Sequence, residues 1–254
     1  MSRLTHAMGR ALARYLQRPA GRYRPYAVTP LPLLRGSLRP ADILLVEGEA
    51  RISSTIKYLT TSTWSHAAFF VGDPDGRDLI EADLLDGVHC VPLERYAHLN
   101  TRICRAVHLT DEDRTRVMAF MRASLGRRYD LKNVIDLARF LLPEPPIPRK
   151  WRRRMLALGS GDPTRAICST LIAEAFQSVR YPILPEPGTD PNDPSRHELL
   201  HIRDHSLFAP RDFDLSPYFA VVKPAIAADF DYRALHWDSA APEVARITPP
   251  SPPS

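Results

Sequence analysis

Five short apolar runs in the first half of the chain have the pattern of β-strands. They are rich in β-branched, leucine and aromatic side chains and are bounded by Gly, Pro or Asp. The runs are "ADILLVEG", "SHAAFFVG", "DLIEAD", "GVHCVPL" and "RICRAVHL". The turn "DPDG" follows the second run, and a turn around Asp86-Gly87 joins the third to the fourth. Short turns between consecutive strands favour an antiparallel meander.

Helical spacing of apolar residues appears between and after these runs. The longest such segment begins after Thr110, the expected N-cap, and its apolar stripe extends to Leu125, before Gly126. Other expected helices are "RISSTIKYLTTS", residues 131–141 and "RAICSTLIAEAFQS", and "YFAVVKP" is a last expected strand. The pattern predicts an α+β fold in which an antiparallel meander sheet packs against helices, including the helix that carries Cys168.

Prolines and a change of composition divide the chain. Of the 25 prolines, many fall in a connector over residues 18–36 and in the C-terminal tail. Residues 1–18 place apolar side chains on one face of a helix and arginines on the other. We therefore expect an N-terminal amphipathic helix and extended connector (1–36), a main domain (37–237) and a disordered Pro-rich tail (238–254).

Composition narrows the class of protein. The chain has 254 residues, a net charge of +5 and three cysteines with no CxxC spacing, which argues against a disulfide scaffold or a structural zinc site. No run approaches the length of a membrane span, and arginines interrupt the N-terminal segment where a secretory signal would need an apolar core. We expect a cytoplasmic protein, with peripheral membrane association if the first helix binds lipid.

Cys168 lies in the first turn of its expected helix, on the same face as Leu171 and Ile172. Unpaired N–H groups and the helix dipole at this position stabilise a thiolate, and the same N–H groups can receive an oxyanion. A small buried thiol in the core is the competing interpretation.

A thiol nucleophile needs a base, and the base needs an orienting partner. His66 stands at the start of the apolar run "HAAFF", and Glu81 interrupts the next run between Ile80 and Ala82. A carboxylate within an apolar strand must be paired or face a polar site. If the two strands pair, Glu81 can hold His66 as the third member of a triad does. His89 is an alternative third residue that could hold His66. In a further alternative, Glu81 faces solvent and has no role in the site.

The ordered set of these segments resembles the NlpC-type papain-like cysteine hydrolases. It is most similar to their circularly permuted branch, the YiiX-like proteins with their poxvirus relatives, which is related to lecithin:retinol-acyltransferase-like proteins. In this order the "DILLV" strand comes first, then the His strand, and the segment "LGRRYD" and the Cys helix come last. The resemblance covers about residues 38–177 and implies that the main domain, 37–237, is a permuted papain-like catalytic domain.

The resemblance also assigns roles to residues. It implies Cys168 as nucleophile, His66 as base and Glu81 as the third polar residue. Tyr129 matches an aromatic hydroxyl near the thiol and, with Ser169, is a candidate for oxyanion support. Asp42 matches the Asp of the family's Gly-Asp strand start, where this chain has Ala41 instead of Gly.

The implied chemistry is acyl transfer through a thioester, with no cofactor and no metal. We expect a cysteine hydrolase or amidase acting on peptide-like amide or isopeptide bonds. The first alternative is a lipid acyl hydrolase or acyltransferase at an anionic membrane surface, contacted through residues 1–18 and the basic cluster 149–154. Without a membrane, residues 1–18 would be a helix docked on the domain, and the basic cluster would lie in a solvated linker. A second alternative is a non-catalytic binding module of the same fold. No nucleic-acid partner is expected, because a single basic cluster is thin support for one.

Overall fold

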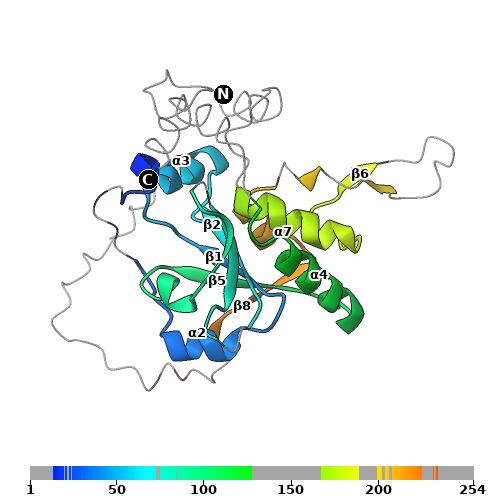
Figure 1. The fold of residues 1–254 in the computed structure, drawn as a ribbon, viewed down its shortest axis with the longest axis horizontal. Helices are drawn as coiled ribbons and strands as arrows, with labels where there is room; N and C mark the ends of the chain where they lie inside the picture. The colour runs from blue at the N-terminus through cyan, green and yellow to red at the C-terminus, as the bar shows by residue number, and fades with distance from the viewer. Residues whose placement is uncertain are drawn as a thin grey trace, which may run out of the picture.

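The computed structural model describes residues 14–19, 21, 23, 25–72, 75–83, 85–127, 167–188, 199–201, 204, 205, 208–224, 231 and 233. These residues form an α+β fold built on one open antiparallel sheet (Figure 1). Its strands are β1 (Ile43–Val46), β2 (His66–Phe70), β3 (Leu79–Asp83), β4 (Gly87–Val91), β5 (Thr101–Ala106) and β8 (Phe219–Val222). All five expected runs and the last strand are therefore present.

Strands β1 to β4 form an antiparallel meander, and two further strands, β5 and β8, extend the sheet on the other side of β1. The strand order is β4-β3-β2-β1-β5-β8, so that β1 to β4 follow each other outward while β5 returns to the other side of β1. Ile43 lies opposite Phe69 of β2 and Cys104 of β5. All four residues of β1 are buried, because β1 is central and both of its faces are covered.

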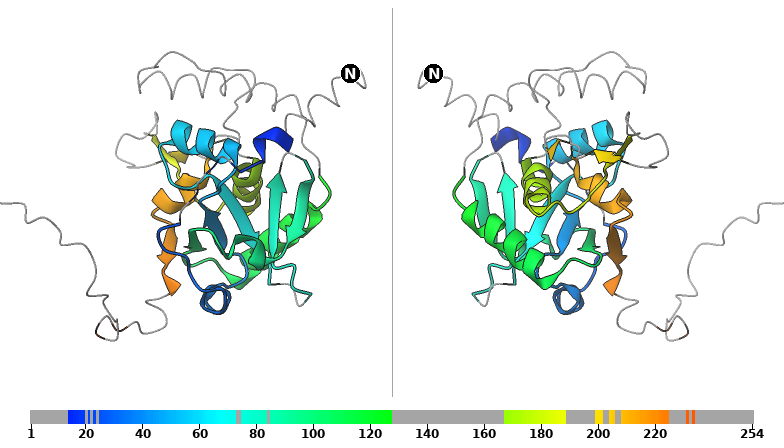
Figure 2. Two further views of the ribbon diagram at one scale, coloured as in Figure 1. Left: turned by 90° about the vertical axis from the view of Figure 1, so that its left-hand side faces the viewer. Right: turned by 90° about the vertical axis from the view of Figure 1, so that its right-hand side faces the viewer.

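Helices cover the two faces of the sheet. Helix α7 (Ile167–Ser178) contacts β2 and β3 and lies beside α4 (Asp111–Ala123) on one face (Figures 1 and 2). On the other face, α2 (Leu31–Ser37) contacts the 3-10 helix η1 (Leu93–Tyr96). Helix α3 (Arg51–Thr60) follows β1, α8 (Pro210–Leu215) precedes β8, and β6 (Glu186–Gly188) pairs with β7 (Leu199–His201) in a separate ribbon.

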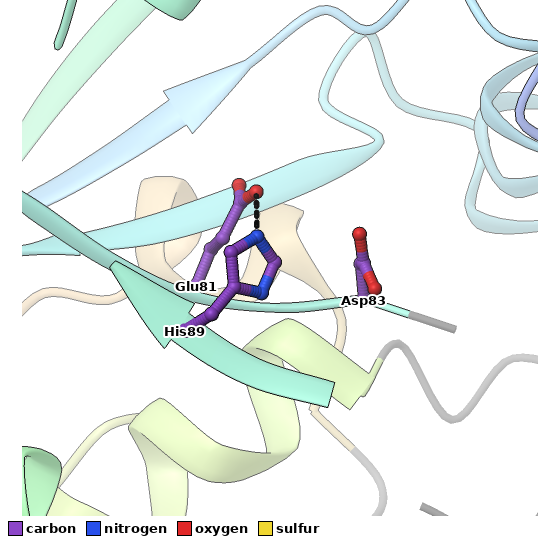
Figure 3. Close-up of side chains that lie close together, drawn as sticks. All are labelled: Glu81, Asp83 and His89. Atoms are coloured by element: carbon purple, nitrogen blue, oxygen red, sulfur yellow. Dashed lines mark ion pairs between the residues drawn. The ribbon is translucent and has the colours of Figure 1, made fainter. Parts of the chain in front are cut away.

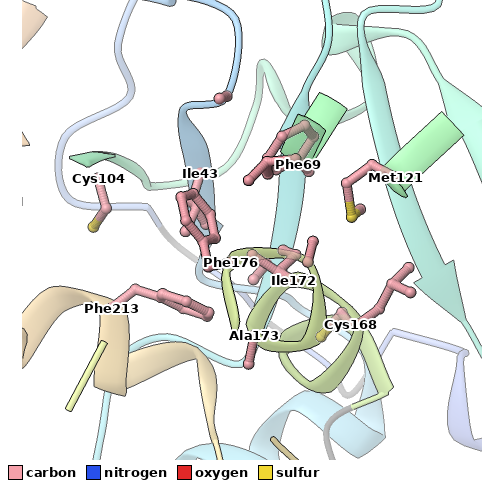
Figure 4. Packing of buried hydrophobic residues seen from close by; sticks show 14 of the residues in the cluster. Ile43, Phe69, Cys104, Met121, Cys168, Ile172, Ala173, Phe176 and Phe213 are labelled. Atoms are coloured by element: carbon pink, nitrogen blue, oxygen red, sulfur yellow. The ribbon is translucent and has the colours of Figure 1, made fainter. Parts of the chain in front are cut away.

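Phe176 centres the core between the sheet and α7. Its ring lies edge-on to Phe69 of β2 and to Phe219 of β8, with centroid distances of 6.4 and 5.2 Å. Figure 4 shows Phe176, Ile172 and Cys168 projecting from α7 among buried apolar side chains. The apolar stripe of α7 thus fixes the helix on the sheet and places Cys168.

Asp42 anchors the beginning of β1. Its carboxylate is 2% exposed and accepts two hydrogen bonds from Arg105 of β5, at 2.8 and 2.7 Å, and a third from the backbone N–H of Arg39. Ala41 just before it has φ of 73°, a left-handed conformation that favours glycine. This backbone geometry gives a physical reason for the glycine that the resemblance expects at this position.

Several sequence expectations need correction. The connector 18–36 is not wholly extended, because Leu31 begins α2, which packs Leu34 into the core. Leu125 does not extend the stripe of α4, because the helix ends at Ala123 and Leu125 is 41% exposed. The expected Thr110 cap is confirmed by its bond from the Asp113 N–H.

The ends of the chain are described only in part. The last turn of the expected first helix is helical over residues 14–16, and Leu16 is fully buried, so this part docks on the domain. Residues 1–13, the expected helix 131–141, the basic cluster 149–154 and the tail 238–254 lie outside the described residues, and the domain division stays a prediction. Within the described part of the chain, no helix has the length and apolarity that a bilayer span requires.

We predict that Asp42→Ala lowers the free energy of unfolding by about 3–5 kcal/mol, because it leaves the guanidinium of Arg105 without its carboxylate. Chemical denaturation followed by circular dichroism measures the change. Asp111→Ala is the matched control, since Asp111 is 95% exposed in its pair with Arg114, and it should cost less than about 1 kcal/mol. Equal effects of the two substitutions would show that Asp42 does not anchor β1.

Candidate active site

The pairing of β2 with β3 places Glu81 near His66. Phe69 lies opposite Ile80, so in the same register Glu81 lies opposite Ala68 and diagonally from His66 on one face of the sheet. Ala68 has only a methyl group, and the two longer side chains meet beside it. His66 Nε2 and Glu81 Oε2 are 2.8 Å apart. The expected partnership of His66 with Glu81 is therefore present in the structure.

Glu81 is a buried carboxylate surrounded by donors. Its side chain is 1% exposed. Oε2 also accepts a short hydrogen bond from the hydroxyl of Tyr96, while Oε1 lies 3.3 Å from His89 Nε2 and 3.4 Å from Arg95 Nη1. The contacts of Oε2 with His66 and Tyr96, and the cationic groups beside Oε1, which itself makes no hydrogen bond among the described residues, offset the cost of burying the charge. A solvent-facing Glu81 is excluded.

Cys168 lies in the first turn of α7 and is 5% exposed. Its thiol lies near enough to His66 to raise the pKa of the imidazole, and the same ring contacts Glu81. The sulfur is buried because α7 packs on β2 and β3, the strands that carry His66 and Glu81. The structure thus brings Cys168, His66 and Glu81 into one cluster.

The charges in this cluster shift its protonation equilibria. Burial disfavours the imidazolium of His66, but Cys168 and Glu81 outweigh it and raise the pKa of His66 to about 10. Burial also opposes the Glu81 carboxylate, but contacts with His66, His89 and Tyr96 hold the pKa of Glu81 well below its usual range. The electrostatics therefore favour a protonated His66 beside an ionised Glu81.

His89 does not compete with Glu81 for His66; it binds the same carboxylate from the other side. Its Nδ1 lies 3.1 Å from the carbonyl oxygen of Gly87, and its Nε2 faces Glu81, so both ring nitrogens face acceptors. The close Glu81 carboxylate raises the pKa of His89 to about 9. His89 is thus held as a cation, because only the imidazolium has a proton for each acceptor.

Glu81, Asp83 and His89 have ligand atoms within 4.8 Å of one another, the one such group found among the described residues (Figure 3). Asp83 already accepts hydrogen bonds from the backbone of Leu85 and Asp86, and His89 is paired with Glu81. A metal ion would have to displace these contacts, and the nearby Arg95 cation would oppose it.

Of the two residues predicted to support an oxyanion, the structure describes Ser169 but not Tyr129. The hydroxyl of Ser169 is fully buried and donates to the carbonyl oxygen of Phe208 at 2.7 Å, so any oxyanion support from Ser169 must come from its backbone N–H. Tyr129 lies outside the described residues. Sequence reasoning missed Tyr96 and Arg95, whose segment "PLERY" has neither helical nor strand periodicity. The 3-10 turn that aims both at Glu81 carries no clear sequence signal.

Comparisons with known proteins find a curated relative and a solved structure that are similar to this chain. No family model matches the chain. The chain is 25% identical over 208 residues to the "Probable lipoprotein peptidase YaeF" of Escherichia coli K12, covering 74% of this chain and 72% of YaeF. It is also similar to the crystal structure of YiiX from Escherichia coli O157:H7, described as a metalloprotein, with a TM-score of 0.46, 16% identity, and 74% of this chain and 97% of that chain covered.

YaeF is named a peptidase, and the match covers more than two thirds of each of the two chains.

We predict that His89 stabilises the fold most at acid to neutral pH. Its pKa is raised from 6.5 to about 9, so its contribution is complete below about pH 6.5 and is lost as the pH rises through about 9. His89→Gln should therefore lower the free energy of unfolding by about 2 kcal/mol at pH 6 and by much less at pH 10. Urea denaturation at the two pH values measures this difference.

His98→Gln serves as the control, because His98 is 62% exposed and lies 3.7 Å from Glu49 in a surface pair. It should change the free energy of unfolding little at either pH. A loss for His89→Gln that is equal at pH 6 and pH 10 would contradict the ion pair with Glu81.

Proposed function

We propose that this chain is a cysteine peptidase or amidase that cleaves peptide-like amide or isopeptide bonds through a thioester on Cys168. The observation that carries the proposal is the placement of His66 beside both Cys168 and the buried carboxylate of Glu81. A nucleophile, a base and an orienting acid in one cluster are what covalent acyl transfer needs. This arrangement argues against a non-catalytic binding module.

In the proposed reaction, His66 carries protons between Cys168, the leaving group and water. His66 takes the proton of Cys168, and the thiolate attacks the carbonyl carbon while N–H groups in the first turn of α7 receive the oxyanion. The C–N bond breaks as His66 gives its proton to the leaving nitrogen, which leaves a thioester. Water then attacks the thioester, His66 takes the water proton, and the acid product departs as the thiol is restored.

Amide substrates are favoured over lipid esters. The reason is that the curated relative YaeF is named a peptidase. The two segments that favour a membrane surface in the sequence, residues 1–13 and 149–154, lie outside the described residues. The lipid acyltransferase alternative, the membrane contact and the cytoplasmic location therefore stay predictions from the sequence. Tyr129 stays a predicted oxyanion residue on the same basis.

We predict that Cys168 is the fast-reacting thiol of the native protein. Cys168→Ala should remove the one rapidly alkylated equivalent of iodoacetamide, as read by mass spectrometry. His66→Gln should slow alkylation at pH 6 about 100-fold or more, because an unassisted cysteine thiol is under about 1% ionised at that pH.

Cys104→Ala is the control for this experiment. Cys104 is fully buried, and burial raises the pKa of its thiol to about 12, so its removal should leave the fast phase unchanged. Equal alkylation rates for Cys90, Cys104 and Cys168 would contradict the role of Cys168 as nucleophile.

The substrate class is testable without knowing the substrate. After brief incubation with peptide extracts and with lipid extracts, acid quenching and intact-mass measurement should show a peptidyl adduct on Cys168 that is absent from Cys168→Ala. A fatty-acyl adduct in place of a peptidyl one would favour the lipid alternative instead.

A further inference from the structure

The two oxygens of Glu81 are held by different groups from three elements. On Oε2, the Tyr96 hydroxyl donates beside His66 Nε2. On Oε1, His89 and Arg95 lie 3.3 and 3.4 Å away. Tyr96 and Arg95 both come from η1, so one short 3-10 turn reaches both oxygens.

Tyr96 also contacts His66 directly. The two ring centroids are 5.8 Å apart at an interplanar angle of 44°, and Tyr96 is 7% exposed. The ring limits the positions open to the imidazole, and the hydroxyl fixes the carboxylate that the imidazole binds. Tyr96 thus touches both partners of the nucleophile.

We propose that Tyr96 is a positioning residue of the catalytic centre, whose hydroxyl, with His89 on the opposite oxygen, keeps Glu81 ionised and turned toward His66. The proposal rests on the proposed role of Cys168 as nucleophile. A hydrogen bond donated to a carboxylate stabilises the ionised form. Without Tyr96, Glu81 would bind a proton at higher pH and would no longer hold the imidazolium.

The groups that face Glu81 determine the sign of this effect. They are His66 from β2, His89 from β4, and Arg95 and Tyr96 from η1, while Cys168 of α7 lies beyond His66 and Asp83 of β3 acts on His89. Tyr96 donates to the anion, and His89 and Arg95 add positive charge. Removing Tyr96 or His89 should therefore shift the loss of Cys168 reactivity upward in pH.

The test is the pH dependence of the iodoacetamide rate constant of Cys168 in the full chain, measured between about pH 3 and 8. In Tyr96→Phe, which keeps the ring and removes one oxygen, the acid midpoint should rise by about one pH unit. His89→Gln should move it in the same direction. The rate at neutral pH should fall by up to about tenfold.

Tyr181→Phe is the matched control. Its hydroxyl donates to the carbonyl oxygens of Val107 and Tyr218, at 2.8 and 2.7 Å, and not to Glu81. Losing these bonds weakens the fold, but the acid midpoint should stay where it is in the wild type. A purely structural role for Tyr96 would lower the native fraction without moving that midpoint.

The outcomes separate the two proposals. An unchanged midpoint in both Tyr96→Phe and His89→Gln, with Cys168 still reacting fast, overturns the role of Tyr96 and leaves the nucleophile in place. If Tyr96→Phe does not fold, as judged by circular dichroism, His89→Gln alone decides the result by the same shift. Slow alkylation of Cys168 in the wild type overturns the proposed function itself.

Discussion

The burial of the Glu81 carboxylate is the constraint on which the rest of the site depends. A charge that is 1% exposed within a sheet would be expelled or neutralised unless several donors surrounded it. Here the donors come from β2, β4 and η1, so three elements must dock correctly before the carboxylate is stable. The candidate active site and the packing of these three elements therefore stabilise each other.

This arrangement links the electrostatics of the site to its chemistry. Glu81 serves His66 on one oxygen and His89 on the other, so the carboxylate holds two imidazolium rings in place. The first ring lies against Cys168, and the second is partly exposed. A thiol beside an imidazole that a fixed carboxylate orients is the arrangement that a thioester mechanism uses. The same arrangement makes stability and reactivity depend on the same side chains.

Much of the fold follows from local pattern. The runs "ILLV", "HAAFF" and "LIEAD" were predictable as strands because apolar residues between turn signals have few other stable conformations. Glu81 could be singled out because a carboxylate in such a run needs a partner. The helix at Leu31–Ser37 was missed, because "LPLLRGS" has prolines on both sides and reads as a connector. Tyr96 was missed because a single 3-10 turn has no periodicity that reveals its direction.

The sequence by itself determined the α+β class, the strand runs, the capped helix after Thr110 and the three residue types from which a thiol site could be built. These are properties of neighbouring residues, and local sterics and burial decide them. The tertiary structure decided which groups meet: the register that sets Glu81 diagonal to His66, the docking of α7 that brings Cys168 to that ring, and the turn that adds Tyr96. Such contacts join residues far apart in the chain, so they depend on packing that no local pattern encodes.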